Sequence, residues 1–377
     1  QNTFTYLTLT TIWTYTHAFF KSIFAISTYQ KFLIINLFRR HTIAKMKYYK
    51  WFDYSRMFKM KRKFKVLLTR RLHEFALAKL RKKYEIIIHS GKIPMPKKRI
   101  LEQIKNKDGL ICFPYDIIDK EVLDSAKKLK SISTFSVGFD HIDIKYAKKK
   151  KITVGYTPDV LTNATAELTI SLIMDLLRRI TEGDHIIRKG QWTEIFGPFD
   201  YVGTEISGKT LGILGMGRIG KSVARKANCL GMNILYHNRK PTARKNNAKY
   251  VSLNELFKKS DIISVHVPYS KDTHHMINLK LLTKMKKTSF LINTSRGRVV
   301  KQNDLLKALQ LKKIQGAALD VFDDEPISKT NDLVKLKNVV LVPHIGSSTS
   351  ETRRTMAEIT VKNLMLGLSN KKLVYSV

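Results

Sequence analysis

The chain has 377 residues and is strongly basic, with 69 Lys and Arg against 30 Asp and Glu and a formal net charge of +39. A hydrophobic content of 43% excludes a wholly disordered or fibrous chain, and the length predicts two or three domains. The two cysteines, Cys112 and Cys229, exclude a disulfide framework and a thiolate zinc site, so a reducing compartment is expected. No run reaches the roughly 18 consecutive apolar residues that a membrane-spanning helix needs.

Residues 1–60 differ from the rest of the chain. They are rich in Thr, Tyr, Phe and Lys, follow neither a helical nor a strand period, and begin with Gln. We expect a targeting segment, a disordered basic extension, or translated sequence upstream of a start at Met46 or Met60. Residues 1–65 hold 13 Lys or Arg and one acid, a net charge of +12. Part of the high net charge therefore belongs to a segment outside the predicted fold.

From Lys61 onward, short apolar runs alternate with segments of helical period. The predicted strands are 64–69, 85–89, 110–113, 132–137 and 152–155, and the predicted helices between them include 72–83, 94–106 and 119–129. Alternation of this kind predicts βαβ units and a parallel sheet whose two faces are covered by helices.

A long helix is predicted over 165–187, where leucines recur at helical spacing. Residues 189–207 contain several aromatic side chains without a clear period and are expected to form an excursion. A second βαβ series begins at Lys209 and runs to about Pro343, and a closing helix is predicted over 349–368. The fold class is therefore α/β, with two doubly wound parallel-sheet domains and no solenoid repeat.

A glycine-rich loop joins the predicted strand 210–214 to the predicted helix 218–230. Its sequence is Gly215-Met216-Gly217-Arg218-Ile219-Gly220, the G-x-G-x-x-G pattern in the context that a dinucleotide site requires. The first glycine allows a tight turn, the second lets the backbone approach a pyrophosphate, and the third permits close packing of helix on strand. Free N–H groups at the helix start favour an anion there. We predict that this loop binds a dinucleotide.

The residues after the next strand indicate which dinucleotide is bound. An NAD site places Asp or Glu about 20 residues beyond the glycines, whereas this chain has Asn238 followed by Arg239 and Lys240. A basic pair without a carboxylate suits a 2′-phosphate. We therefore expect NADPH as coenzyme, with NADH as the weaker alternative. The other interpretation is that the two cations only add to a basic surface.

Five further segments carry a resemblance to a known family. Three follow predicted strands and hold Arg296, Glu325 and His344, within 290–297, 318–326 and 342–347. The other two are Ser136-Val137-Gly138-Phe139-Asp140-His141 and the stretch 154–167. Together they closely resemble the D-isomer-specific 2-hydroxyacid dehydrogenases, and 154–167 looks most like the eukaryotic glyoxylate/hydroxypyruvate reductases. The resemblance runs from about Lys63 to the C-terminus.

This resemblance implies NADPH-preferring reduction of small 2-keto acids to D-2-hydroxy acids, glyoxylate to glycolate and hydroxypyruvate to D-glycerate. It implies a flavodoxin-like substrate domain at 61–160 plus 346–377 and a Rossmann coenzyme domain at 161–345. The active site is expected in the cleft between these domains. No metal site is predicted.

Reduction of a 2-keto acid needs a hydride at the carbonyl carbon and a proton at its oxygen. His344 is the natural acid, because histidine titrates near the working pH. Glu325, if hydrogen-bonded to the other ring nitrogen, would fix the tautomer and stabilise the imidazolium. Arg296 offers a donor fork for the substrate carboxylate and keto oxygen.

The resemblance also implies roles for the residues around these three. Backbone N–H groups of Val137 and Gly138 are expected to hold the substrate carboxylate. Asp320 resembles the family residue that positions the nicotinamide carboxamide. Val267 and Thr294 look like lining of the cofactor groove, and Gly346 is expected at the cofactor site and near a domain crossing.

The resemblance extends to assembly: residues 189–207 and the helix before them are similar to the family's dimer-forming region, so a homodimer is expected, with intramolecular packing as the alternative. Cytosol is the expected compartment, with mitochondrion as runner-up.

Competing functions are another D-2-hydroxyacid dehydrogenase, such as one for 3-phosphoglycerate, and a dinucleotide-sensing corepressor on the same fold. Neither nucleic acid nor a membrane is expected as a partner, since no recognised nucleic-acid module accompanies the charge.

Overall fold

A computed structural model describes residues 62–91, 93–241 and 247–377 of the chain. Residues 63–377 form one compact unit. The predictions made for residues 1–60, including the possible starts at Met46 and Met60, lie outside the described residues. Within the described part of the chain, none of the helices combines the length and apolar character needed to cross a membrane.

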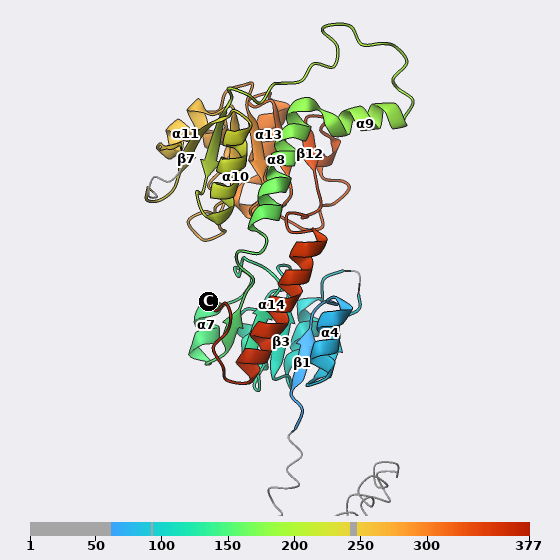
Figure 1. Cartoon of the computed structure of the whole chain (residues 1–377), viewed down its shortest axis with the longest axis vertical. Helices are drawn as coiled ribbons and strands as arrows, with labels where there is room; N and C mark the ends of the chain where they lie inside the picture. Colours follow the sequence, from blue (N-terminus) through green and yellow to red (C-terminus); the bar gives the residue numbers. More distant parts are fainter. Residues whose placement is uncertain (1–61, 92, 242–246) are drawn as a thin grey trace, which may run out of the picture. The chain divides into compact units, whose positions relative to one another are not determined.

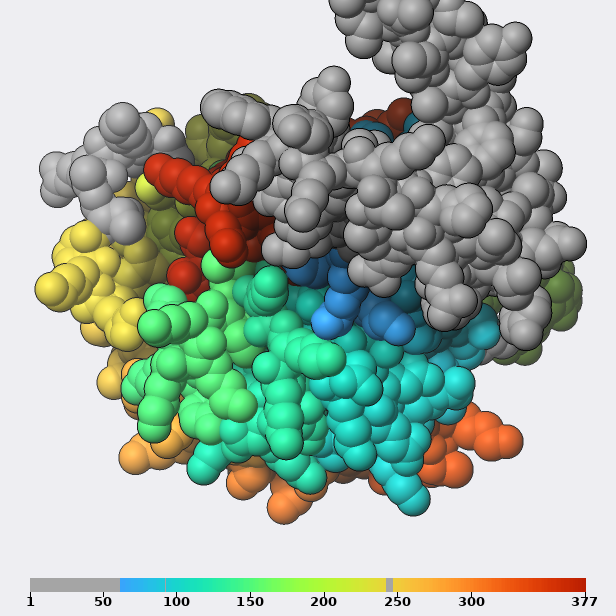
Figure 2. Space-filling model, turned by 90° about the horizontal axis from the view of Figure 1, so that it is seen from below, coloured from blue at the N-terminus to red at the C-terminus, as the bar shows by residue number. Residues whose placement is uncertain are grey.

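The first sheet has five parallel strands in the order β2-β1-β3-β4-β5, a flavodoxin-like arrangement that confirms the predicted class. Its strands are β1 (Lys65–Leu68), β2 (Glu85–Ile88), β3 (Gly109–Cys112), β4 (Ser131–Thr134) and β5 (Thr153–Gly155). The helices around it are α4 (Glu74–Arg81), α5 (Lys97–Ile104), α6 (Lys120–Ser125), α7 (Ile144–Lys149) and α14 (Ser350–Leu368). In the space-filling view, the segments from residue 63 to about 160 form one continuous surface, coloured blue to green (Figure 2).

Alternation along β1 explains why helices cover both faces of this sheet. Val66 and Leu68 pack with α4 and α14, whereas Leu67 between them packs with α5 and α6 on the opposite face. All three side chains are fully buried. The closing helix α14 thus returns the end of the chain to the first sheet, where it lies beside β3 and β4 (Figure 1).

The second sheet has seven parallel strands in the order β12-β11-β10-β9-β6-β7-β8. Its strands are β6 (Thr210–Leu214), β7 (Asn233–His237), β8 (Ala248–Tyr250), β9 (Ile262–Val265), β10 (Phe290–Asn293), β11 (Gly316–Leu319) and β12 (Val339–Leu341). Its helices include α8 (Thr162–Arg178), α10 (Arg218–Cys229), α11 (Leu253–Lys259), α12 (Leu279–Leu282) and α13 (Gln302–Gln310), with 3-10 turns η1 (Gly297–Val299) and η2 (Asp332–Lys335). Strand order reverses beside β6, which is where doubly wound sheets bind dinucleotides. The predicted Rossmann class is confirmed, while the domain limits at 160 and 346 stay predictions.

The single helix predicted over 165–187 is wrong, because the structure divides it into α8 and α9 (Ile180–Arg188). Arg179 between them is in the left-handed region, with φ of 56°. Its guanidinium donates twice to Glu182, at 2.8 Å each, and lies over the ring of Tyr201. Asp175 accepts from the N–H and hydroxyl of Thr181, which starts the new helix. These side-chain contacts stabilise a bend that the apolar period does not reveal.

Residues 189–207 leave the second sheet as a loop between α9 and β6, as the predicted excursion requires (Figure 1). The segment exposes apolar side chains to an unusual degree, since Ile195 and Phe199 are each 92% exposed. Ile180 and Ile187 on α9 are also largely exposed. An apolar surface of this kind is typical of a protein–protein contact.

Candidate active site

A pocket of about 870 Å³ lies where strands of both sheets end. Segments that follow β3 and β4 line it from the first sheet, and segments that follow β6, β10, β11 and β12 line it from the second. Eleven of the predicted site residues line this pocket: Val137, Gly138, Gly217, Arg218, Ile219, Val267, Thr294, Arg296, Asp320, His344 and Gly346. Carboxyl ends of parallel strands are where open α/β sheets bind ligands. The structure therefore brings most of the predicted residues together.

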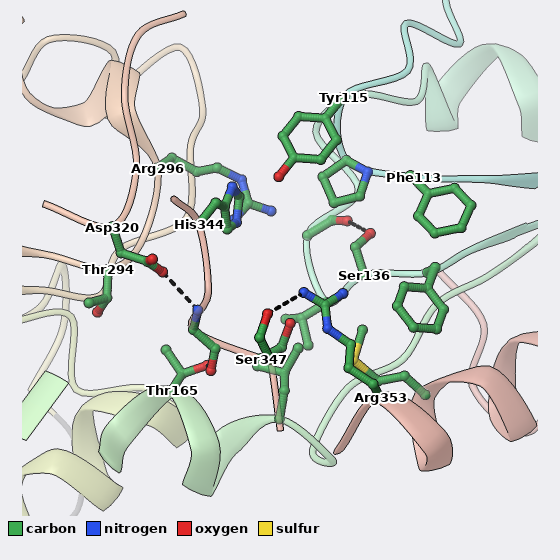
Figure 3. Close-up of a pocket in the computed structure, with 18 of the residues that line it drawn as sticks. Phe113, Tyr115, Ser136, Thr165, Thr294, Arg296, Asp320, His344, Ser347 and Arg353 are labelled. Atoms are coloured by element: carbon green, nitrogen blue, oxygen red, sulfur yellow. Dashed lines mark hydrogen bonds between the residues drawn. The ribbon is translucent and has the colours of Figure 1, made fainter. Parts of the chain in front are cut away.

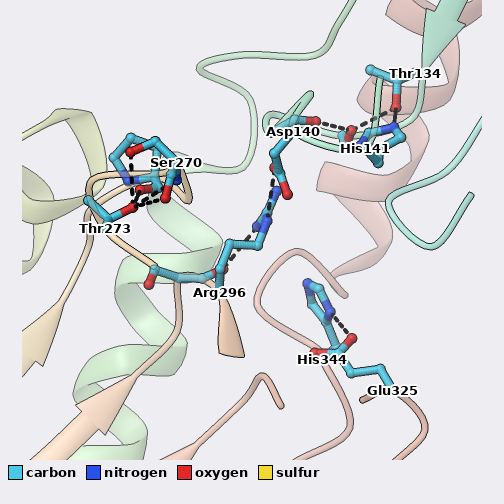
Figure 4. Close-up of polar contacts among 12 residues, drawn as sticks. Thr134, Asp140, His141, Ser270, Thr273, Arg296, Glu325 and His344 are labelled. Carbon is cyan, nitrogen blue, oxygen red and sulfur yellow. Dashed lines mark hydrogen bonds and ion pairs between the residues drawn. The ribbon is translucent and has the colours of Figure 1, made fainter. Parts of the chain in front are cut away.

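His344 and Glu325 form a direct pair at this pocket (Figure 4). Nδ1 of His344 lies 2.6 Å from Oε2 of Glu325, and Oε1 of the same carboxylate accepts from the backbone N–H of Phe322 at 2.9 Å. A proton on Nδ1 suits the carboxylate acceptor, which leaves Nε2 as the nitrogen available to a ligand. His344 itself has a left-handed backbone, with φ of 53°. The hydrogen bond that the predicted acid–base pair requires is present.

Asp320 holds the segment that follows His344. Its two carboxylate oxygens accept from the backbone N–H groups of Ile345, at 2.6 Å, and Gly346, at 2.9 Å. Thr165 donates to the carbonyl of Gly346 at 3.0 Å. Burial raises the pKa of Asp320 to about 6. The observed contacts of Asp320 are thus to the backbone beside His344, and its expected contact with a nicotinamide carboxamide stays a prediction.

The guanidinium of Arg296 contacts the loop that follows β4. Nε donates to Oδ1 of Asp140 at 3.2 Å, and Nη1 donates to the carbonyl of Ser295 at 2.9 Å. A Cβ atom on Gly138 would overlap this guanidinium, so the close approach depends on glycine at that position. Arg296, His344 and Tyr115 all line the pocket (Figure 3).

The glycine loop has the shape that a pyrophosphate requires. Gly215 has φ of +102°, and a Cβ there would lie 2.7 Å from the carbonyl carbon of His266. A Cβ on Gly220 would overlap the carbonyl oxygen of Gly215, so α10 packs closely on β6. Gly217, in contrast, has nothing within 4 Å of its would-be Cβ. The backbone at the start of α10 is therefore open to an anion, and these residues fit a dinucleotide.

The remaining coenzyme residues have distinct surroundings. Arg218 pairs with Asp159, with Nε 2.6 Å from Oδ1. Asn238 accepts from the backbone N–H of Met216 at 2.7 Å, so its side chain holds the glycine loop from the end of β7. Arg239 and Lys240 are exposed and have no ion-pair partner among the described residues. Their charges are available to a ligand phosphate.

Tyr115, Asp140 and Arg353 also line the pocket, and none of the three is among the predicted site residues. The ring of Tyr115 meets the ring of His344 edge-on at 5.7 Å, and burial raises its pKa. Arg353 donates to the hydroxyl of Ser348 at 2.9 Å, and burial lowers its pKa (Figure 3). Tyr115 follows the strand ending at Cys112, which is a usable signal, because strand ends carry ligand sites. Arg353 lies in the first turn of α14 and has no such signal.

Comparison with known proteins agrees with this fold. Residues 170–346 match the model of the D-isomer specific 2-hydroxyacid dehydrogenase NAD binding domain. A glyoxylate reductase of Thermofilum pendens is 46% identical over 312 residues, which are 81% of this chain and 92% of the relative. A solved structure of a Thermus thermophilus protein has a TM-score of 0.78 at 41% identity, covering 83% of this chain and 99% of that one.

A second solved structure is an NADPH-dependent glyoxylate/hydroxypyruvate reductase from Sinorhizobium meliloti in complex with NADP and malonate. It is 28% identical, with a TM-score of 0.75, and the match covers 84% of this chain and 97% of that one. The fold and the pocket are those of a nicotinamide-dinucleotide-dependent oxidoreductase that acts on the CH–OH group of a small hydroxy acid or on the corresponding keto acid. The chain belongs to the D-isomer specific 2-hydroxyacid dehydrogenase family.

Proposed function

We propose that this protein reduces glyoxylate and hydroxypyruvate to the corresponding 2-hydroxy acids, with NADPH preferred over NADH. The observation that carries the proposal is that His344, paired with Glu325 at 2.6 Å, lines the same pocket as Arg296. The names of the relatives, glyoxylate reductase and glyoxylate/hydroxypyruvate reductase, support the substrate class.

Each of these side chains has one task in the proposed reaction. A bound reduced nicotinamide supplies the hydride that the keto carbon receives. His344 donates the proton from Nε2 to the keto oxygen, and Glu325 holds the Nδ1–H so that the ring keeps one orientation. Arg296 stabilises the negative charge that develops on that oxygen. The backbone N–H groups of Val137 and Gly138 hold the substrate carboxylate.

His344→Ala tests the acid assignment. We expect kcat for glyoxylate reduction to fall by about 10² to 10⁴, the contribution of a positioned general acid, while the Kd of NADPH from fluorescence titration changes little. His274→Ala is a matched control, because His274 is exposed and does not line the pocket. A His344→Ala enzyme that keeps more than a tenth of the wild-type kcat would refute the assignment.

The preference for NADPH rests on Asn238, Arg239 and Lys240. A double substitution, Arg239→Gln with Lys240→Gln, removes both exposed cations without introducing an acid. We expect the ratio of kcat/KM with NADPH to kcat/KM with NADH to fall at least about tenfold, the effect of one lost charge-assisted bond. A wild-type enzyme that uses NADH as well as NADPH would contradict the preference directly.

The proposed assembly is a homodimer formed through α9 and residues 189–207. The exposed apolar side chains of this region support it, because Ile195 and Phe199 make little contact within the described chain. Light scattering at micromolar concentration tests the assembly, and Ile195→Ser with Phe199→Ser should shift a dimer toward monomer. A wild-type monomer at that concentration would exclude it. The compartment of the protein stays a prediction.

A further inference from the structure

The ion pair between Arg296 and Asp140 lies at the pocket, and the proposed reaction gives Asp140 no task. Oδ1 of Asp140 lies 3.2 Å from Nε of Arg296, although 156 positions separate the two residues in the chain. Asp140 belongs to the loop after β4, and Arg296 follows β10, so the pair joins segments of the two sheets (Figure 4). The two side chains are partly covered, with 28% of the Asp140 side chain and 26% of the Arg296 side chain exposed.

The loop that carries Asp140 is held by a chain of buried and partly buried hydrogen bonds. The hydroxyl of Ser136 donates to the carbonyl of Gly138 at 2.6 Å. The hydroxyl of Thr134 lies 2.7 Å from that of Ser136 and 3.0 Å from Nε2 of His141. Asp140 therefore lies between Gly138 and His141, two anchored positions. Burial lowers the pKa of His141 to about 4, so the network does not change its charge at neutral pH.

The guanidinium of Arg296 is held at two of its five N–H donors. Nε is bound by Asp140 and Nη1 by the carbonyl of Ser295, which together fix the plane of the group. Nη2 lies against the backbone of Gly138, which has no Cβ to obstruct it. The N–H donors that these two bonds leave are available for the keto oxygen and carboxylate of a substrate, in one fixed orientation.

The same contact has a cost for substrate binding. A carboxylate beside the guanidinium partly neutralises the charge that attracts an anionic keto acid. Preorganised donors nevertheless accelerate a reaction, because no orientation is lost when charge develops on the keto oxygen. Removal of the Asp140 charge would therefore favour ground-state binding of an anion and impair the chemical step. A residue that only stabilised the fold would not separate these two quantities.

We infer that Asp140 is a positioning residue for Arg296. It fixes the orientation of the guanidinium and thereby weakens the binding of the anionic substrate. The inference rests on the proposed role of Arg296 in substrate reduction. It assigns to Asp140 a function in turnover, exerted through Arg296 and without contact with the substrate.

Asp140→Asn and Asp140→Glu test this inference, with Asp324→Asn as control. Asp324 is an exposed acid near Glu325 that makes no ion pair among the described residues, so it controls for the loss of one negative charge nearby. We expect Asp140→Asn to lower kcat for glyoxylate at least about tenfold, while KM stays equal or falls. Asp140→Glu should recover part of kcat, because it keeps the charge. Thermal unfolding of each variant shows whether it is folded.

Oxamate provides the second measurement, since it presents a carboxylate and a carbonyl that is not reduced. In the presence of NADPH, Asp140→Asn should bind oxamate as tightly as wild type or severalfold more tightly. Unchanged kcat, or a parallel loss of kcat and oxamate affinity in a folded variant, would overturn the inference. If Asp140→Asn does not fold, Asp140→Glu is the deciding variant. A wild-type kcat together with weakened oxamate binding in Asp140→Glu would overturn the inference. A wild-type protein that fails to reduce glyoxylate would refute the proposed function instead, and the oxamate measurement would still test Asp140.

Discussion

Glu325 can be tested by a substitution that changes one atom. Its two oxygens accept from Nδ1 of His344 at 2.6 Å and from the backbone N–H of Phe322 at 2.9 Å. Glu325→Gln keeps the size of the side chain but leaves a single acceptor for two N–H donors. If the amide oxygen stays on Phe322, its NH₂ group faces Nδ1 and favours the tautomer that carries its proton on Nε2. The ring is then neutral and a poor acid.

The magnitude follows from the hydrogen bond and from the tautomer. A charge-assisted hydrogen bond contributes about 1.5 to 3 kcal/mol, which corresponds to a factor of about 10 to 150 in rate. An equivalent carboxylate-to-amide change behind a catalytic histidine lowers kcat by about 10⁴ in serine proteases, because the wrong tautomer is populated. We therefore expect Glu325→Gln to lower kcat by about 10² to 10⁴, with the Kd of NADPH nearly unchanged.

The assay is reduction of glyoxylate at saturating NADPH. The Kd of NADPH, measured beside kcat, separates a loss of proton donation from a loss of coenzyme binding. Asp324→Asn should keep wild-type kcat, because Asp324 is exposed and makes no ion pair among the described residues. A folded Glu325→Gln enzyme within threefold of wild-type kcat would refute the coupling.

Three further predictions concern single residues. Gly138→Ala places a Cβ against the Arg296 guanidinium and should lower kcat/KM for glyoxylate at least about tenfold. The Kd of NADPH, which should not change, is the control. A normal kcat/KM would show that the close approach is not required. Burial lowers the pKa of His141 and His266 to about 4 each, below the value near 6.5 of an unfolded chain. The unfolded state therefore binds protons first, so the free energy of unfolding should be greatest above pH 6.5 and fall toward pH 4, by up to roughly 3 kcal/mol per histidine; a flat urea-unfolding profile would contradict this. Burial raises the pKa of Asp320 to about 6, and its carboxylate form, which prevails above that pH, binds the two backbone N–H groups best. Wild-type kcat should therefore decline below pH 6. Asp320→Asn should have a low kcat that does not change across this pH range.

Much of the fold could be predicted because its signals are local. Each strand is a short apolar run, and Gly215 and Gly220 occupy positions where a turn and close packing exclude a side chain. The order of these segments then limits the topology to few possibilities. The bend at Arg179 could not be found in this way, since it depends on Glu182 and on Tyr201 22 positions away.

The residues of the site also fall into those that the sequence identifies and those that it does not. Arg296, Glu325 and His344 could be identified because each follows a strand and has a side chain suited to the chemistry. The identity of their partners could not. Asp140 lies in a segment of recognised pattern, but its contact with Arg296 depends on how two sheets meet. The family pattern predicts that Asp320 faces the coenzyme, whereas its bonds to the backbone after His344 arise only in the folded chain.

The net charge of +39 can be compared with the charges at the pocket. Arg296 is paired with Asp140, Arg218 with Asp159, and His344 with Glu325, so three cationic groups of the pocket have their own carboxylates. The excess positive charge is therefore carried mostly by the rest of the molecule. Charge of this kind attracts anions over distance, and salt screens it, whereas a mostly covered pair such as His344–Glu325 is screened much less.

Ionic strength should accordingly separate capture of the substrate from its conversion. We expect kcat/KM for glyoxylate to fall severalfold between low salt and about 0.5 M NaCl, where the Debye length is only a few ångströms, while kcat changes little. Sodium chloride and potassium acetate at matched ionic strength distinguish screening from competition by one particular anion. If kcat/KM is insensitive to both salts, the surface charge does not assist capture. If kcat falls in parallel with kcat/KM, salt is disrupting the catalytic groups, and the view that the His344–Glu325 pair is protected from the solvent is wrong.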